Sequence, residues 1–495
     1  MLRILYSVSF ASLVLISGCA VGPDFKKPSP PEAKAYQSES SSPQTGDAQR
    51  LIASMDIPAQ WWTLFRSPSL NKLVEQSITS NPDFAAAKAA LRAARENIRA
   101  QQGAYWPSVD ANFNPTRQKT PRSLSPVPSD NDYIYSLHTA QLSISYVPDV
   151  FGLNRRTVES LEAQAEAQRY QVEATYLTLT SNLVNAAIQE AALREQIEAT
   201  RAIIDDQSQT LDSFIRQSDL GNVAEAEVAA QRALLAQVQA TLPPLERQLQ
   251  QQRDAIKALA GRFPDTEVAV FPSLDNFTLP GELPLSLPAQ LVNQRPDVLA
   301  AEAQLHSASA QIGVAVANRL PNFSIDASVG SSSDMVSHLF EAGTGFWSLA
   351  ANVTQPVFKG GTLRHMQRAA EALYEQAAAQ YRGTVIGALQ NVADTLHAID
   401  ADTREWRAAI VSEQAARRAL DITRAQFQLG DVNYLAMLNA ETTWREAKLV
   451  LIQAQTARLS DSVALFQALG GGWWNRTSNA NQVESSATVA EADQR

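Results

Sequence analysis

Cys19 is the residue whose neighbours most clearly indicate covalent chemistry. It is the only cysteine in the 495-residue chain, and Ile16-Ser17-Gly18-Cys19 fits the bacterial lipobox, in which the cysteine is acylated and becomes the mature N-terminus. Arg3 and an apolar stretch at 4–16 precede it, a pattern typical of signal peptides and too short for a permanent membrane helix. We therefore expect a signal peptide at 1–18 and lipid attachment at Cys19. An ordinary cleaved signal with an incidental cysteine is the alternative.

The other residue types that carry catalysis are scattered. Nucleophile elbows and phosphate loops are missing from the sequence, and Gly343-Thr344-Gly345 lacks the rest of a dinucleotide fingerprint. An excess of acids, 51 Asp+Glu against 41 Lys+Arg, argues against a nucleic-acid partner. We therefore expect no enzyme, no cofactor and no metal site. The histidines also show no metal-ligand spacing; they are His138, His306, His338, His365 and His397.

Several segments of the sequence occur twice, in the same order. Asn81-Pro82-Asp83 opens a segment that recurs without a gap from Arg295-Pro296-Asp297, with nine identities in 27 positions. The shared Pro-Asp start matters more than the shared alanines, because it punctuates helices at the same place. Later pairs keep nearly the same offset, among them Leu220-Gly221-Asn222-Val223 and Leu429-Gly430-Asp431-Val432. An internal duplication of this kind favours a ring or tube over a single cleft.

Proline-free stretches predict two long helical hairpins, at 154–261 and 362–469. Each outgoing helix would be nearly 100 Å long at about 1.5 Å per residue. A Leu-Gly-Asn/Asp-Val turn ends it, where glycine suits the C-terminal cap and Asn222 or Asp431 can cap the returning helix. We expect Pro243-Pro244 to break the first returning helix, as a kink or a belt contact, and we expect one earlier helix from about Pro68 to Ala104.

Period-two alternation predicts a strand pair before each hairpin, at 107–148 and 321–358. Apolar residues alternate with small polar ones over about ten positions, as in strands with lipid on one side and water on the other. A half-buried soluble sheet gives the same pattern. Because a membrane barrel needs at least about eight strands, four strands per chain require several chains to share one barrel. Two chains or three would satisfy this count. The apolar positions include Val109, Ala111, Phe113, Leu142, Ile144, Ile325, Ala327, Val329, Trp347, Leu349 and Val353.

These features follow one another in a distinctive order. After the lipobox and a tether at 19–60 comes Trp61-Trp62-Thr63-Leu64-Phe65, and then Asn81-Pro82-Asp83, a strand pair and a hairpin. We divide the chain into a first repeat at 61–270, a second at 271–472 and a C-terminal tail at 473–495. From Cys19 to about Trp474 this order resembles the outer-membrane efflux lipoproteins of the TolC superfamily, the NodT/OprM-like channels of RND-type tripartite efflux.

The resemblance implies a mainly α fold with a membrane β-barrel portion. Three protomers would form a homotrimer with a shared 12-stranded β-barrel, and the hairpins would form a periplasmic α-barrel. The implied function is a passive exit duct for small molecules such as drugs and toxic compounds, delivered by an inner-membrane RND-type pump and a periplasmic adaptor protein. The implied location is the outer membrane of a Gram-negative bacterium, and Ala20 after the lipidated cysteine agrees with that sorting.

The hairpin tips carry the remaining candidate residues. By the same resemblance, the adaptor docks at Asp219, Leu220, Gly221, Asn222, Gly430 and Val432. Asp431 is the candidate for a charged ring that closes the periplasmic gate, with Leu429 and Tyr434 as neighbours. Three carboxylates around one axis would favour cations. The alternative is that Asp431 only caps its helix.

Three other functions share part of this pattern. A periplasmic adaptor lipoprotein also has a long hairpin, but it has one hairpin and a soluble β-domain. A type I protein-secretion exit duct would share the channel but usually lacks the lipid anchor. A lipid-anchored periplasmic enzyme would have no reason to carry the repeated strand pairs.

Overall fold

The computed structural model describes residues 20–29, 36, 49–119, 121, 134–267, 270–271 and 273–476. The predicted signal peptide, Cys19 and most of the C-terminal tail lie outside these residues. The chain divides into two compact units. Unit 1 contains Ala90–Arg169 and Ala300–Arg382 with the N-terminal segment up to Pro28, and unit 2 contains the rest.

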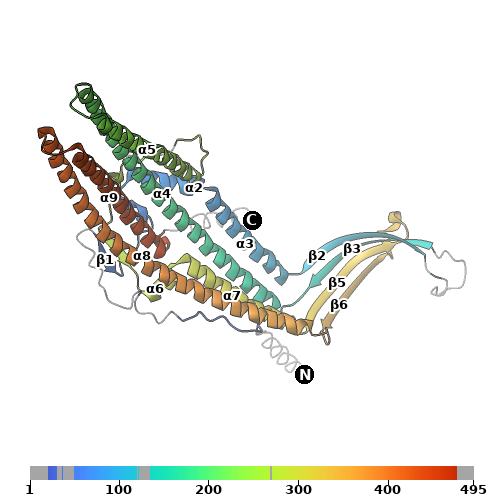
Figure 1. Cartoon of the computed structure of the whole chain (residues 1–495). Helices are drawn as coiled ribbons and strands as arrows, with labels where there is room; N and C mark the ends of the chain where they lie inside the picture. The colour runs from blue at the N-terminus through green and yellow to red at the C-terminus, as the bar shows by residue number, and fades with distance from the viewer. Residues whose placement is uncertain are drawn as a thin grey trace. The chain divides into compact units, whose positions relative to one another are not determined.

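Unit 1 is built around one four-stranded antiparallel sheet, drawn in Figure 1. Its strand order is β2-β3-β5-β6, so the second strand of the first repeat pairs with the first strand of the second repeat. Both predicted strand pairs are confirmed. Their bounds are β2 Ser108–Lys119, β3 Ile134–Tyr146, β5 Asn322–Ser333 and β6 Gly345–Thr354.

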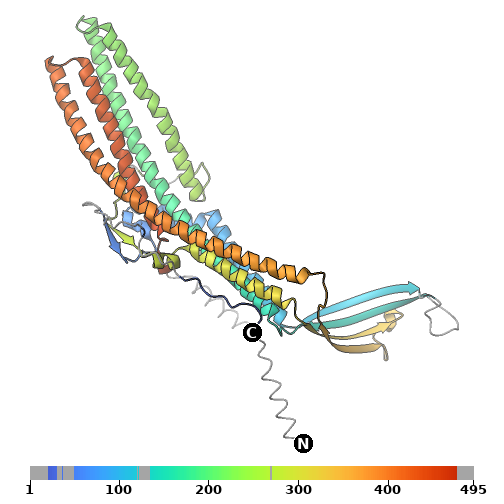
Figure 2. The same ribbon diagram turned by 60° about the horizontal axis from the view of Figure 1, so that its bottom comes forward.

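Unit 2 holds the two helical hairpins, whose helices lie side by side in Figures 1 and 2. The first joins α4 (Leu153–Asp219) to α5 (Glu225–Leu259), and the second joins α8 (Thr362–Leu429) to α9 (Tyr434–Ala468). The outgoing helices have 67 and 68 residues and both returning helices have 35, so the two copies match in length. The predicted hairpins are confirmed, and the first parts of α4 and α8 belong to unit 1.

Two local expectations are wrong. The predicted helix from Pro68 to Ala104 is two helices, α2 (Pro68–Ser80) and α3 (Pro82–Gln102), because Asn81 is extended ahead of Pro82. A residue before proline avoids the helical region for steric reasons. Pro243-Pro244 does not end the returning helix, since α5 continues through both.

The duplication explains how each hairpin is held at its base. Asn81 Nδ2 donates to the carbonyl of Leu259, the last residue of α5, at 2.9 Å. In the second copy Arg295 occupies the aligned position, and its Nη1 donates to the carbonyl of Ala468 at the end of α9, at 3.0 Å. The last carbonyls of a helix have no partner within the helix, so an external donor stabilises this end. Two different side chains thus do the same work in the two repeats.

A small parallel sheet and an aromatic cluster complete unit 2. Strand β1 (Arg50–Ala53) pairs with β4 (Glu282–Leu285), which gives defined structure to part of the stretch that the sequence suggested was a tether. Trp61 and Trp62 are fully buried, and the Trp61 ring stacks on Phe466 at 5.3 Å. The remaining elements are α6 (Pro288–Gln294), α7 (Pro296–Ala317) and the 3-10 helices Trp61–Phe65, Gly103–Tyr105, Leu274–Asn276, Val336–His338 and Trp473–Asn475.

We predict that Gly261→Ala destabilises the protein more than Gly221→Ala does. Both glycines have positive φ, 66° and 77°, so each substitution costs about 1 kcal/mol of backbone strain. A Cβ on Gly261 would also lie 2.4 Å from the carbonyl oxygen of Ser80, whereas nothing lies within 4 Å of one on Gly221. Overpacking adds about 1–3 kcal/mol. Thermal unfolding followed by circular dichroism should show the larger loss at Gly261, and equal losses would contradict this account of the hairpin base.

Candidate functional site

One face of the four-stranded sheet is apolar and exposed in the protomer. The register aligns Val109 with Ile144, and Val329 with both Leu142 and Trp347, so the apolar residues of all strands share this face. Trp347 is 78% exposed. A contiguous apolar patch of this kind is rare on a protein surface in water and marks a contact with lipid or protein. The exposed members are Val109, Phe113, Leu142, Ile144, Ile325, Val329, Trp347, Leu349 and Val353.

The other face of the sheet carries a polar network. Asp326 accepts hydrogen bonds from Ser145 at 2.8 Å, from Ser324 at 2.9 Å and from Asn352 at 2.9 Å. The Ser328 and Ser348 hydroxyls lie 2.8 Å apart. The sheet therefore separates an apolar side from a side that suits water, as a channel wall does.

The edge strands of the sheet have one partner each. Within the described part of the chain, β2 pairs only with β3 and β6 pairs only with β5. Each edge therefore presents unpaired backbone N–H and C=O groups. In lipid such groups cost several kcal/mol each, so an open edge does not persist there.

At the hairpin tips, the turns form as expected but the caps do not. Gly221 and Gly430 adopt positive φ, and the N–H groups of Asn222 and Asp431 each donate to a carbonyl five residues earlier, at 2.9 Å. Neither side chain caps the returning helix. Asn433 caps α9, where its side chain accepts from the Ala436 N–H, and Ala224 precedes α5 without a side-chain cap. The capping role expected for Asn222 and Asp431 is wrong.

The candidate docking and gate residues fall into two groups. Leu220 is 75% and Leu429 77% exposed, and the neighbouring Asp431 side chain is also exposed. Asp219, Gly221, Asn222 and Gly430 are exposed as well, and Val432 is half-buried. Tyr434 is different, because it is buried between the hairpins.

Tyr434 belongs to an aromatic cluster that joins the two hairpins near their tips. Its ring meets Phe214 of α4 edge-to-face at 4.3 Å, and Phe427 of α8 lies about 6 Å from both rings. Val228 and Met437 complete the buried group. The cluster packs residues from all four hairpin helices, so it stabilises one arrangement of the two hairpins.

A polar network behind this cluster was not found from the sequence. Arg424 of α8 donates to Asp206 of α4 at 2.6 Å and to Glu441 of α9 at 3.1 Å. Gln207 Nε2 donates to the other oxygen of Glu441, and Gln231 of α5 donates to Gln207 at 2.6 Å. We call these five residues the hairpin lock. No sequence signal could have found it, because its members are ordinary helix residues up to 235 positions apart.

Burial makes the lock sensitive to the loss of any member. Glu441 is only 6% exposed, and this burial, together with the charge of Asp206, raises the pKa of its carboxyl. The hydrogen bonds from Arg424 and Gln207 act in the opposite direction and favour the charged form. An unpaired charge at this position would cost several kcal/mol. Arg424 therefore links the two hairpins and compensates a buried acid at the same time.

A second acidic pair lies in the α8–α9 hairpin. Burial and the neighbouring Asp402 carboxyl raise the pKa of Asp461 from 3.8 to about 7. Arg458 of α9 does not neutralise this pair, because its guanidinium lies over the ring of Trp406 instead, 4.1 Å from the centroid. Two like charges that cannot both ionise in one site share a proton.

Among the described residues, no group of three or more His, Cys, Asp or Glu side chains is placed to hold a metal ion. None of the described helices is both long and apolar enough to span a bilayer.

Comparisons with known proteins agree with this geometry. The model of the family "Outer membrane efflux protein" matches the chain twice, at residues 73–262 and 287–471. The pyoverdine export outer membrane protein OpmQ of Pseudomonas aeruginosa is 31% identical over 419 residues, which cover 84% of this chain and 87% of its own. The toluene efflux pump outer membrane protein TtgF of Pseudomonas putida is 29% identical over 485 residues, which cover 95% of this chain and 98% of TtgF.

Solved structures of outer-membrane channels are also similar to this chain. The outer-membrane channel OprN superposes with a TM-score of 0.81 at 25% identity, over 92% of this chain and all of its own. The open state of the Neisseria gonorrhoeae MtrE outer membrane channel gives a TM-score of 0.80 at 26% identity, over 93% of this chain and 100% of the MtrE chain.

The fold and the two-sided sheet define a non-enzymatic export channel of the outer membrane. The chain belongs to the outer membrane efflux protein family, and the two matches of the family model confirm the internal duplication. It is the outer-membrane component of an efflux pump. The adaptor and enzyme alternatives are therefore wrong.

We predict that Asp461→Asn removes a pH dependence of stability. Between about pH 4 and pH 7 the folded protein holds a proton that the unfolded chain releases, so the free energy of unfolding falls as pH rises through this window. At about pH 8 the asparagine variant should be more stable than the wild type by about 1–2 kcal/mol, after allowance for partial exposure to solvent. Thermal melts across pH measure this. Asp400→Asn on the exposed surface of α8 is the matched control. If the free energy of unfolding of Asp461→Asn changes with pH as steeply as that of the wild type, the explanation is wrong.

Proposed function

We propose that three copies of this chain close a 12-stranded barrel in the outer membrane and continue into the periplasm as a tunnel of hairpins. The observation that carries the proposal is the sheet, which has an exposed apolar face, a polar face and two edges without partners. Strands of 10–13 residues are long enough to cross a bilayer at a tilt. Pairing β6 of one protomer with β2 of the next removes every edge.

The count of three is supported by the family rather than by the sheet itself. Two chains would give eight strands, which also close, but an eight-stranded barrel has an interior that side chains fill. Twelve strands leave room for water and a solute. The polar network around Asp326 would then line the lumen.

Within this assembly the hairpin tips bind the periplasmic adaptor protein, which links the channel to an inner-membrane RND-type pump. An exposed leucine followed by a left-handed glycine occurs at both tips, Leu220-Gly221 and Leu429-Gly430. Asp219, Asn222 and Val432 flank these pairs. Exposed apolar side chains that recur at equivalent positions favour a contact with protein. The energy for export comes from the pump.

The transported compounds are small organic molecules. The relatives are named for toluene and pyoverdine export. The channel itself contributes a passive route.

In the resting state the tunnel is closed at the second tip by Asp431 and Leu429, with Tyr434 holding their turn in place. The side chain of Asp431 has no capping role, and it is exposed. Asp431 is therefore available to form a charged ring with two other protomers. The hairpin lock keeps the two hairpins in the closed arrangement. Acylation of Cys19 adds a lipid anchor to the barrel.

We predict that the purified protein conducts ions in planar bilayers as a homotrimer. Native mass spectrometry in detergent should give three chains per particle, and conductance should appear at the same protein concentration. Asp431→Asn should reduce the preference for cations over anions, because it removes three negative charges from the pore mouth. A particle of two chains would overturn the trimer, and a protein that never conducts, even as the Asp431→Ala variant, would overturn the closed barrel.

We also predict that Arg424→Ala opens the channel. It breaks the ion pairs to Asp206 and Glu441, and loss of a charged hydrogen bond weakens the closed state by about 2 kcal/mol, or about thirtyfold in open probability. Single-channel recording measures this probability. Arg404→Ala is the matched control, because Arg404 pairs with Asp400 on the exposed surface of the same helix. Equal effects of both substitutions would remove the lock from the mechanism.

A further inference from the structure

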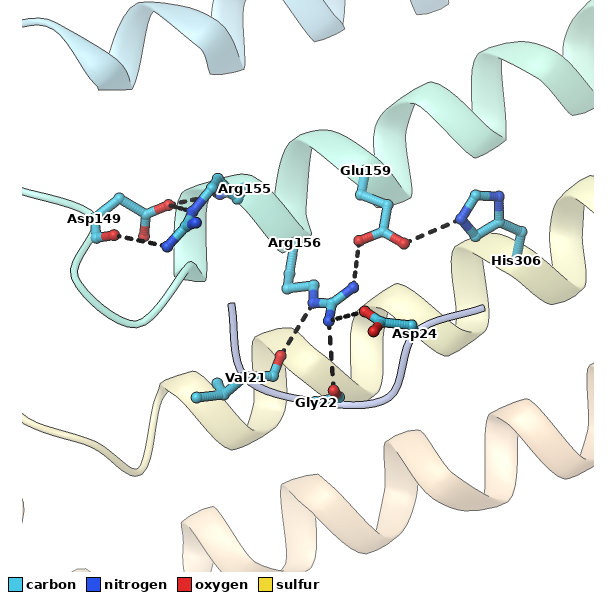
Figure 3. Close-up of polar contacts among 8 residues, drawn as sticks. All are labelled: Val21, Gly22, Asp24, Asp149, Arg155, Arg156, Glu159 and His306. Carbon is cyan, nitrogen blue, oxygen red and sulfur yellow. Dashed lines mark hydrogen bonds and ion pairs between the residues drawn. The ribbon is translucent and has the colours of Figure 1, made fainter. Parts of the chain in front are cut away.

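The segment from Ala20 to Pro28, which directly follows Cys19, packs against α4 and α7 instead of lying free. We call this segment the strap. All of its contacts described below lie within unit 1 (Figure 3). Its sequence is Ala-Val-Gly-Pro-Asp-Phe-Lys-Lys-Pro.

Arg156, near the start of α4, holds the strap through its backbone. The Arg156 guanidinium donates to the carbonyl of Val21 at 3.0 Å, to the carbonyl of Gly22 at 3.4 Å and to the carboxylate of Asp24 at 2.8 Å (Figure 3). Its remaining nitrogen donates to Glu159 at 2.7 Å. The Arg156 side chain is only 5% exposed, whereas Asp24 is 90% exposed. The planar guanidinium makes four directed contacts at once, which the single ammonium group of lysine cannot reproduce.

Two glycines allow the strap to approach α7 this closely. Gly22 has a φ of 98°, and a Cβ on it would lie 2.4 Å from the Cα of Gly313. A Cβ on Gly313 would lie 2.8 Å from Cγ of Arg156 and 2.9 Å from the carbonyl oxygen of Val21. Neither position has space for a larger residue, so the groove is shaped for backbone that carries glycine.

Side chains fix the other end of the strap. Phe25 stacks on the ring of His306 at 4.4 Å, and His306 Nε2 lies 3.0 Å from Glu159, the acid that also pairs with Arg156. Lys27 forms an ion pair with Glu302 at 3.1 Å. The strap is therefore bound at several points along its length, by carbonyl, carboxylate, ring and ammonium contacts.

The first residue of the strap lies beside the loop between β3 and α4. The Val21 N–H donates to the carbonyl of Phe151 at 3.1 Å. A Cβ on Gly152 would lie 2.7 Å from Ala20, so these two residues are in direct contact.

We propose that the groove between α4 and α7 is a binding site for the mature N-terminal segment, with Arg156 as its positioning residue. The site holds the first described residue of the strap, Ala20, at the end of the sheet where β3 passes into α4. The acyl chains then enter the membrane at the helix-side edge of the barrel. This role rests on the proposed acylation of Cys19 and on the barrel, whereas binding of the strap does not.

Limited proteolysis of the full-length protein in detergent micelles, where trypsin reaches the periplasmic side, tests the proposal. Trypsin does not cut before proline, so the Lys26–Lys27 bond is the tryptic site within the strap. Arg156→Ala should speed cleavage there at least about tenfold, the factor expected for loss of one charge-assisted hydrogen bond. Proteolysis of a segment that opens and closes quickly follows the fraction that is open. Gly313→Ala should have a similar effect, because its Cβ displaces the strap.

Two variants serve as matched controls. Arg155→Ala removes the adjacent arginine, which contacts Asp149 and not the strap, and should leave the rate unchanged. Gly387→Ala places a Cβ in open space on α8 and should also have no effect. Cleavage after Arg216, at the first tip, reports general loosening and should stay constant in every variant.

The outcomes separate the two hypotheses. Wild-type cleavage rates in Arg156→Ala would overturn the binding site. If Arg156→Ala does not assemble, Asp24→Ala decides the question, because Asp24 is exposed and lies on the strap itself; a rate equal to wild type would again overturn the proposal. The mass of the released N-terminal peptide reports acylation separately. An unmodified Cys19 with accelerated cleavage in the variants would refute the lipid anchor and leave the strap site standing.

Discussion

The constraint on which the rest of the structure depends is that a sheet in lipid cannot keep an open edge. Each chain supplies four strands with an apolar face, and the outer edges of β2 and β6 are unpaired within the described chain. A soluble protein would cover such an edge with a helix, a charge or a proline. Here the edges are long and regular, so pairing between chains is the remaining solution. The sheet therefore requires several copies of the chain, and the hairpins of these copies share the symmetry of the barrel.

The duplication supplies equivalent scaffolds without requiring equivalent side chains. Asn81 and Arg295 hold the ends of α5 and α9 in the same way, although one side chain is a neutral amide and the other a cation. Evolution can therefore change a residue in one copy while the geometry of the hairpin base is kept. The tips show the same freedom, because Asn222 and Asp431 form equivalent turns and only the second carries a charge.

Patterns of local period were enough to predict the strand pairs, the hairpins and the repeat. Proline-free length and period-two alternation are properties of consecutive residues, so they can be seen in one sequence. The cap at Asn433 was missed because the helix begins two residues later than the duplicated motif suggested. The hairpin lock was missed for a different reason: Asp206, Arg424 and Glu441 meet only when three helices pack, and none carries a local signal. Nor could the sequence show that Arg156 contacts the strap, since 132 residues separate it from Asp24.

The burial of Tyr434 changes how a gate at the second tip can work. A side chain packed between Phe214 and Phe427 cannot swing into a pore without opening the cluster. Movement of the proposed gate would therefore require separation of the hairpins. The hairpin lock lies on the same four helices, and Glu441 would lose its compensating cation if α8 moved away from α9. Buried charge and packed rings thus resist the same displacement, so the proposed adaptor would have to act on both hairpins together to open the tip. The equivalent exposed leucines at the two tips are its proposed points of contact.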